Sequence, residues 1–379
     1  MTRETVFSNA RIVLEDEVIH GSLLVRDGMI EDISAGSSHL GEDFEGDYLI
    51  PGLIELHTDH LEGHYSPRPG LRWNKTAAIQ AHDAQIVTSG ITTVFDCLRM
   101  GSDEDGGFDK GEMRDMADAI QKAEAEGRLR AEHLLHLRCE VSADNVMDHF
   151  ADFENDSHVR LVSLMDHAPG QRQFQTMDQY IFYYQKKRGL SDAEFAIFVD
   201  KRVEESQRNS TPHRVAISEV CRQRGITIAS HDDATLTHVE EAIENGVRLA
   251  EFPTSIEAAK ASHANGMSVL MGAPNIVRGG SHSGNIAAKD LAEHDVLDVL
   301  SSDYVPLSLL YAPFLLVDQV ESITLPKAIS MVTATPARTV DLNDRGRIAP
   351  GLRADVVRVF RDEGVPVCRS VWRRGRRVA

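Results

Sequence analysis

The chain has 379 residues, of which 42% are hydrophobic and 26% are charged, as in a globular protein with one large domain or two smaller ones. Its formal net charge of −19 argues against a general nucleic-acid or anionic-membrane surface, although a local basic pocket stays compatible with an anionic substrate. The first residues lack the pattern of a signal peptide and no apolar run approaches the length of a transmembrane helix, so we expect neither. The four cysteines form no CxxC pair, which favours reduced thiols in the cytoplasm.

Both ends of the chain are rich in strand-like segments. Within residues 1–51, apolar and polar residues alternate, and Asp27-Gly28 stands between two such runs as a hairpin turn does. Residues 341–379 have the same character. We therefore expect both termini to form one small β-domain, a β-sandwich, which flanks a central domain of residues 52–340.

The central segment alternates short apolar runs with helix-like stretches. The eight runs are residues 52–56, 91–98, 131–140, 159–166, 226–230, 247–253, 267–274 and 295–303. Strands that alternate with helices in this way predict an α/β fold, a (β/α)8 TIM-like barrel. The polar and aromatic segment around 170–225 predicts helices inserted over the barrel mouth, as a lid.

Possible metal ligands recur where the apolar runs end, and barrel active sites lie at the carboxyl ends of strands. The candidates are His57, Asp59, Glu140, His167, His231 and Asp303. Residues two apart in a strand face the same way, so His57 and Asp59 can bind one ion. Imidazoles with several carboxylates favour Zn²⁺, Mn²⁺, Fe²⁺ or Co²⁺ over Mg²⁺ alone.

Each candidate taken singly also has a structural explanation. His231 is compatible with a core histidine, Asp303 with a turn cap, and Glu140 with an ion pair to Arg138. Their recurrence at successive strand ends makes coincidence the weaker account. His60 and His64 lie past the first strand, and we interpret them as structural or substrate-facing residues.

The stretch "LIPGLIELHTDH" resembles the first-strand motif of the amidohydrolase superfamily, an apolar run followed by PG and HxH. The β-rich termini are similar to the flanking β-domain of that superfamily. Two positions depart from its pattern, because Asp59 replaces the second His and Glu140 replaces a carboxylated Lys. The resemblance implies a barrel hydrolase with a dinuclear metal site.

Five blocks resemble one branch of that superfamily, the diphosphatases of the carbon–phosphorus lyase pathway. They are "HTDHLEGHYSPRPGLRW", "HLRCE", "LMDHAPGQRQF", "GAPNIVRGGSHSGN" and "SSDYVPLSLL". This resemblance implies metal-dependent hydrolysis of a phosphoanhydride of α-D-ribose 1-methylphosphonate 5-triphosphate during phosphonate catabolism. The products would be the 5-phosphate and pyrophosphate.

For this reaction we predict two divalent transition-metal ions, zinc in the first place and manganese, iron or cobalt as alternatives. The predicted ligands are His57, Asp59 and Asp303 for one ion and His167 and His231 for the other, with Glu140 as the bridge. Asp303 is also the predicted catalytic general base, because it can contact both metal and water.

A triphosphate also needs cationic and N–H donors from the protein. The predicted substrate-binding residues are Arg68, Lys75, Arg172, Arg278, Gly279, Gly280, Ser281 and His282. Guanidinium groups bind phosphate oxygens through two parallel hydrogen bonds. The successive backbone N–H groups of residues 279–281 would form an anion-binding site, called a nest. The alternative for each arginine is a solvated surface position.

Two other functions stay open. An amidohydrolase that cleaves a C–N bond, such as a deaminase or cyclic amide hydrolase, would share the metals and the base but need fewer cations. A non-catalytic member of the fold would have lost ligands from its strand ends, whereas here five strand ends keep them. We expect a phosphorylated sugar as the partner, with no nucleic acid or membrane, and a homodimer is among the alternatives for the assembly.

Overall fold

The computed structural model describes residues 3–379 except 69, 102–110, 173–179, 186–188, 282–284 and 363. The chain divides into two compact units. The first unit comprises Met1–Asp96, Asp118–Leu134 and Met271–Ala379, and the second comprises Cys97–Ala117 and Leu135–Leu270. The four cysteines are free thiols, as predicted. In the described part of the chain, we find no helix with the length and apolar character that a membrane crossing requires.

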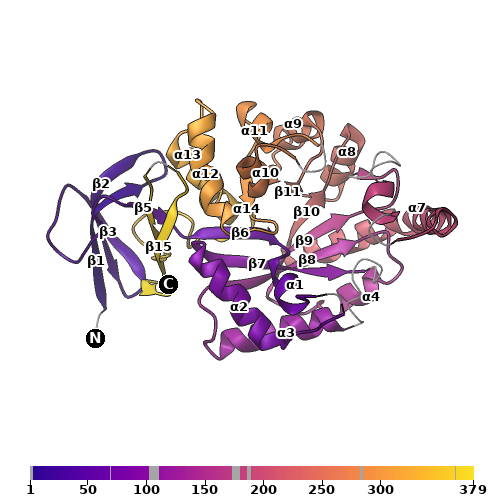
Figure 1. The fold of residues 1–379 in the computed structure, drawn as a ribbon, viewed down its shortest axis with the longest axis horizontal. Helices are drawn as coiled ribbons and strands as arrows, with labels where there is room; N and C mark the ends of the chain where they lie inside the picture. The colour runs from indigo at the N-terminus through magenta and orange to yellow at the C-terminus, as the bar shows by residue number, and fades with distance from the viewer. Residues whose placement is uncertain are drawn as a thin grey trace. The chain divides into compact units, whose positions relative to one another are not determined.

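The two ends of the chain build one sheet within the first unit (Figure 1). Its strands are β1 (Glu4–Val13), β2 (Val18–Arg26), β3 (Met29–Ala35), β4 (Glu42–Asp43), β5 (Tyr48–Pro51), β14 (Val356–Phe360), β15 (Val367–Arg373) and β16 (Arg376–Arg377). The order is β16-β15-β14-β5-β1-β2-β3, with β4 paired to β1. The predicted β-domain from both termini is therefore confirmed, while its predicted limits stay a prediction.

The turn between β2 and β3 is the hairpin that the sequence predicted. Asp27 and Gly28 both have positive φ angles, 50° and 86°, and the flanking residues Arg26 and Met29 pair directly. Two central residues with positive φ match the twist of a right-handed β-ribbon, and Asp-Gly is a preferred pair there. A Cβ atom at Gly28 would also lie 2.8 Å from the carbonyl oxygen of Arg374.

The terminal strands share one apolar core although they form a single sheet. Phe7 of β1 packs against Phe44 and Trp372 of β15, with ring centroids 5.3 and 4.6 Å away. Ile30 of β3 belongs to the same cluster as Trp372 of β15. Strands β3 and β15, which lie near opposite edges of the sheet, therefore contribute to one core. The sheet therefore curls on itself, which produces the sandwich-like packing that the alternating pattern predicted.

The central strands form the second sheet, a nearly closed parallel barrel. They are β6 (Leu53–Thr58), β7 (Ile91–Met100), β8 (Glu132–Glu140), β9 (Val159–Met165), β10 (Thr227–His231), β11 (Leu249–Glu251), β12 (Ser268–Gly272) and β13 (Val299–Ser301). They are hydrogen-bonded in chain order, and a parallel bridge between Thr58 and Asp303 follows the two outermost strands. Each strand coincides with a predicted apolar run, so the (β/α)8 fold is confirmed.

Helices connect these strands. In the first unit they are α1 (His60–Tyr65), α2 (Lys75–Thr88), α10 (Ala273–Arg278), α11 (Ala288–Glu293), α12 (Ser308–Gln319), α13 (Leu325–Ser330) and α14 (Ala334–Thr339). In the second they are α4 (Val146–Ala151), the π-helix η3 (Ile181–Gln185), α7 (Asp192–Arg224), α8 (Leu236–Glu244) and α9 (Ile256–Ala264), while α3 (Glu112–Ala125) belongs partly to each unit.

The predicted insertion around 170–225 is helical where the structure describes it. Its main element is α7, a helix of 33 residues. The hydroxyl of Ser191 accepts from the N–H of Glu194 and the Glu194 carboxylate accepts from Ser191, a capping box that begins the helix. Gly225, in the left-handed region, ends it. The predicted position over the barrel mouth stays a prediction.

Candidate metal centres

In the first unit, a buried carboxylate holds the end of β6 beside the end of β13. Glu55 accepts hydrogen bonds from the backbone N–H of His57 at 2.7 Å and from that of Ser302 at 2.6 Å. Burial raises the pKa of Glu55 to about 7, although these donors act in the opposite direction. The side chain thus joins two strand ends that each carry predicted metal ligands.

Backbone hydrogen bonds bring the three predicted ligands of the first ion onto adjacent chain segments. The N–H of Asp59 donates to the carbonyl of Asp303 at 2.9 Å, and the N–H of Asp303 donates to the carbonyl of His57 at 3.1 Å. Asp303 has a φ of 56°, a left-handed conformation that is uncommon outside glycine and concentrates at functional sites. The backbones of His57, Asp59 and Asp303 are therefore adjacent, and their joint role as metal ligands stays a prediction.

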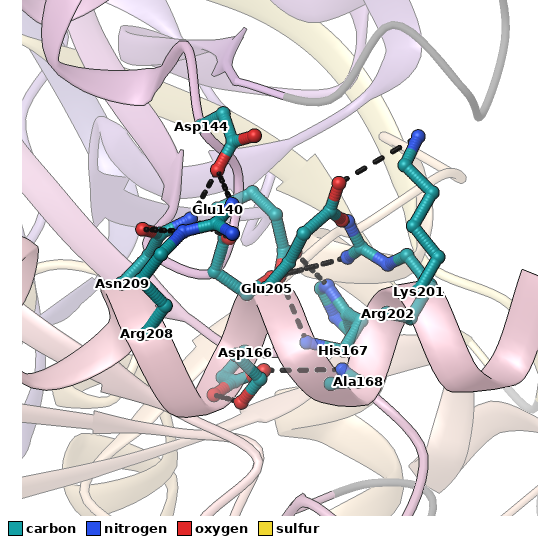
Figure 2. A network of polar contacts seen from close by, with 12 residues as sticks. Glu140, Asp144, Asp166, His167, Ala168, Lys201, Arg202, Glu205, Arg208 and Asn209 are labelled. Atoms are coloured by element: carbon teal, nitrogen blue, oxygen red, sulfur yellow. Dashed lines mark hydrogen bonds and ion pairs between the residues drawn. The ribbon is translucent and has the colours of Figure 1, made fainter.

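In the second unit, Glu140 orients His167 at the ends of β8 and β9 (Figure 2). Its Oε2 lies 2.6 Å from Nδ1 of His167, and its Oε1 accepts from the backbone N–H of His167 at 3.0 Å. The hydroxyl of Ser142 and the guanidinium of Arg202 donate to the same carboxylate. Burial works to raise the pKa of Glu140, but His167 and Arg202 outweigh it and lower the pKa to about 2.

His231, the last residue of β10, is oriented by a second buried carboxylate. Its Nδ1 lies 3.2 Å from Oε2 of Glu251, which also accepts from the hydroxyl of Ser163 at 2.6 Å. With Glu251 ionised, its carboxylate only accepts hydrogen bonds, and in that state Nδ1 of His231 would carry the hydrogen and leave the lone pair on Nε2. Metal-ligating histidines are commonly held by a carboxylate on the other nitrogen in this way.

The Nε2 atoms of both histidines face Asp232. Its Oδ2 lies 3.5 Å from Nε2 of His231 and 3.9 Å from Nε2 of His167. This oxygen is buried and has no hydrogen-bond partner among the described residues, and one ligand atom of each of the three residues lies within 4.8 Å of the others. A divalent cation would satisfy this oxygen, and the set of two imidazoles and one carboxylate suits Zn²⁺ or a similar ion.

Three residues in and around the group of His167, His231 and Asp232 were not predicted as site residues. Asp232 stands beside His231 in the sequence, and its φ of 57° is a structural signal that no sequence pattern carries. Glu251 ends a strand of only three residues, and Arg202 lies inside the long helix α7. Glu140 contacts four donor groups of this unit, so the contacts favour an orienting role, and its predicted role as a metal bridge stays a prediction.

The predicted phosphate-binding residues occupy varied positions. Arg68 is exposed, Lys75 is the first residue of α2, and Arg278 is the exposed last residue of α10. His282 lies outside the described residues. Ser281 follows α10 and is partly buried.

Two predictions for this group need correction. Gly279 and Gly280 donate their N–H groups to the carbonyls of Ile276 and Asn275, because they end helix α10, so they do not form the predicted anion nest. Arg172 is only 4% exposed.

The guanidinium of Arg172 is paired with two carboxylates of the second unit, Asp233 and Glu241. Burial lowers the pKa of Arg172 to about 10, and nearby Arg214 acts in the same direction. Arg172 therefore neutralises internal carboxylates, and nothing in its contacts supports the predicted role on a substrate pocket wall.

The family follows from a comparison with known proteins. The model of the amidohydrolase family matches residues 48–378. The chain is also 48% identical over 376 residues to alpha-D-ribose 1-methylphosphonate 5-triphosphate diphosphatase of Escherichia coli (strain K12), which covers 98% of this chain and 100% of that protein. This chain belongs to the amidohydrolase family. It is therefore a hydrolase by family, and the resemblance of "LIPGLIELHTDH" to the superfamily motif is confirmed.

Two solved structures share the fold at low sequence identity. The beta-aspartyl dipeptidase of Fervidobacterium islandicum AW-1 has a TM-score of 0.65 and 16% identity, with 99% of this chain and 96% of that chain covered. N-acetylglucosamine-6-phosphate deacetylase of Pasteurella multocida has a TM-score of 0.62 and 14% identity, with 99% of each chain covered. At these identities the likeness concerns the architecture alone.

Proposed function

We propose that this amidohydrolase hydrolyses a phosphoanhydride of α-D-ribose 1-methylphosphonate 5-triphosphate, releasing pyrophosphate and leaving the 5-phosphate. The observation that carries the proposal is the near-complete, 48% identical match to a diphosphatase of that substrate. Ligand sets at the strand ends support it, because cleavage of a phosphoanhydride needs charge neutralisation and an activated water. The reaction would serve phosphonate catabolism in the cytoplasm.

The proposed metal ligands fall into one set for each unit. His57, Asp59 and Asp303 would hold one divalent ion, and His167, His231 and Asp232 would hold another. Such ions, zinc in the first place, supply Lewis-acid stabilisation of phosphoryl oxygens and lower the pKa of water. Glu140 and Glu251 would keep the imidazoles of the second set in the tautomer and orientation that binding needs.

Asp303 is the proposed general base. A carboxylate that accepts a proton from water must stay ionised and within reach of that water, and the hydrogen bonds of its backbone fix its position beside His57 and Asp59. Among the predicted phosphate ligands, Arg68, Lys75 and Arg278 lie on the described surface or at helix ends and are proposed to contact the triphosphate.

The test is product analysis with the purified protein and a ribose 5-triphosphate phosphonate. We expect pyrophosphate and the 5-phosphate in equal amounts, detected by phosphorus NMR, and no product after treatment with a chelator. Release of orthophosphate alone would place the cleavage at another bond. Inertness toward every triphosphate together with ammonia release from cyclic amides would instead assign the protein to C–N hydrolysis.

A further inference from the structure

Helix α1 presents two histidines one turn apart, outside the ligand sets described above. His60 and His64 have the i, i+4 spacing that places two side chains on one helix face, and their ring centroids are 4.7 Å apart. An HxxxH pair on a helix is a recurrent zinc-binding arrangement. The helix supplies two imidazoles, so a metal site would need at least one further ligand.

Helix α2 supplies that ligand from the same unit. Nδ1 of His82 lies 3.1 Å from Nδ1 of His60, and the rings of His64 and His82 are 6.1 Å apart. One ring nitrogen from each of the three histidines lies within 4.8 Å of the other two. Three imidazole nitrogens from two packed helices thus converge on one place.

A buried chain of hydrogen bonds determines which nitrogen His82 presents. Its Nε2 lies 2.8 Å from Oδ1 of Asp96, whose Oδ2 lies 2.7 Å from Nδ1 of His133. His133 in turn contacts Asp83, and all four side chains are fully buried. Because the Asp96 carboxylate accepts, Nε2 of His82 donates and its Nδ1 lone pair faces His60. A carboxylate behind a ligand histidine is the usual support of a metal site.

One ring nitrogen of His64 has no hydrogen-bond partner in the part of the chain that the structure describes. This nitrogen is Nε2, and it is buried. A buried polar atom without a partner is destabilising, and such atoms in native proteins commonly mark a bound water or ion. The cluster contains no carboxylate or thiolate among its three converging groups, so its ligand chemistry is that of nitrogen alone.

We propose that His60, His64 and His82 form an additional transition-metal site that joins α1 to α2. Three imidazole ligands suit Zn²⁺, and also Co²⁺, Ni²⁺ or Cu²⁺, rather than Mg²⁺ or Ca²⁺. Three protein ligands leave the fourth tetrahedral position to water or an anion. His60 binds in the tautomer whose hydrogen has moved from Nδ1 to Nε2, so no net proton is lost from the neutral ring. Because α1 directly follows His57 and Asp59, the ion would stabilise the segment that begins with those residues.

The test compares metal binding by the full-length wild-type protein, His64→Gln and His82→Asn. After removal of all metal, each protein is titrated with Zn²⁺ or Co²⁺, and bound metal is measured by elemental analysis and by the absorption of Co²⁺. We expect each variant to bind one ion per chain fewer than the wild type at saturation of the tight sites. His64 is only partly buried, so His64→Gln keeps the test valid if His82→Asn fails to fold.

Two controls separate this site from the strand-end sets. His294→Gln changes an exposed histidine and should bind metal as the wild type does. In a His231→Asn background, the change His64→Gln should still remove one ion, whether or not the proposed diphosphatase activity exists. Zn²⁺ should also raise the melting temperature of the wild type more than that of His64→Gln. Equal stoichiometry and equal thermal shifts in the wild type and His64→Gln would overturn the proposal.

Discussion

The two ends of strand β8 each hold a glutamate whose pKa is lowered to about 2, partly buried Glu132 and buried Glu140, yet the partners of the two residues differ in kind. At the amino end, Glu132 lies 2.7 Å from Nη1 of Arg353 and 3.0 Å from Nη1 of Arg345. At the carboxyl end, Glu140 lies 2.6 Å from Nδ1 of His167. Burial alone would raise both pKa values, so in each case the neighbouring positive charge decides the result.

The difference between the partners fits a role in stability at one end of the strand and the proposed metal binding at the other. Arginine stays charged at every accessible pH, so the contacts of Glu132 serve only to neutralise it. Histidine titrates and binds metals, and the ring that Glu140 orients turns its other nitrogen toward Asp232. In barrels the amino ends of strands contribute to stability and the carboxyl ends to catalysis, and the proposed function gives the two ends of β8 the same division.

The largest loss of activity is expected when Asp303, the proposed general base just after strand β13, is replaced. Asp303→Asn should reduce kcat by about 10²–10⁴-fold, because an amide cannot accept the proton of water. Fold and most of the bound metal should persist, as measured by circular dichroism and elemental analysis. Asp295→Asn is the matched control, since Asp295 is exposed and shares the positive φ. More than about a tenth of the activity in Asp303→Asn would assign the base elsewhere.

A substitution at the amino end of β8 should lower the free energy of unfolding and leave turnover unchanged. Glu132→Gln should lower the free energy of unfolding by about 3 kcal/mol at pH 7, because two buried arginines lose their shared partner. The pKa of Glu132 is lower in the folded than in the unfolded chain, so its contribution is present above pH 4.5 and is lost as the pH falls toward 2.

Urea unfolding at pH 7 and pH 3 measures this effect. The difference between the wild type and Glu132→Gln should shrink markedly at the lower pH. Glu126→Gln, at an exposed glutamate paired with Arg128, should change stability little at either pH. A loss of turnover in Glu132→Gln without a loss of stability would contradict the assignment of the amino end of β8 to stability.

The carboxyl end of β8 should show the reverse pattern. Glu140→Gln removes the charge that orients His167, and the loss of such a supporting carboxylate typically weakens metal binding by about 10–100-fold. Competition with a chromophoric chelator measures the affinity, with Glu132→Gln as the control at the other end of the strand. Unchanged affinity in Glu140→Gln would show that His167 needs no orienting partner.

The smallest expected effect concerns the end of α10, which follows β12. Arg278→Ala should raise KM for a triphosphate by about tenfold, the order of one charge-assisted hydrogen bond at an exposed position. A compound without the terminal phosphates should be affected much less. Arg128→Ala, at another exposed arginine, serves as the control. Equal effects on both substrates would mean that Arg278 does not contact the polyphosphate.

Sequence patterns predicted the strand framework because strands depend on local periodicity. The apolar runs at 91–98 and 159–166 coincide with β7 and β9, and Asp27-Gly28 forms the predicted hairpin. The same patterns did not distinguish a charge that faces a substrate from one that is neutralised inside the protein. Arg172 stood in a block that resembles the diphosphatases, but its guanidinium pairs with Asp233 and Glu241, the latter 69 positions away in the chain.

The sequence by itself determined the order of strands and helices, the β-domain from both termini, and the residue types at the strand ends, because periodicity, turn chemistry and strand direction act over a few residues. Only the tertiary structure decided which of these groups meet. It pairs His231 with Glu251, 20 positions later, and it brings His82 to His60, 22 positions earlier. Such pairs depend on how strands and helices pack, since the hydrogen bonds and buried charges that select them join residues with no common local pattern.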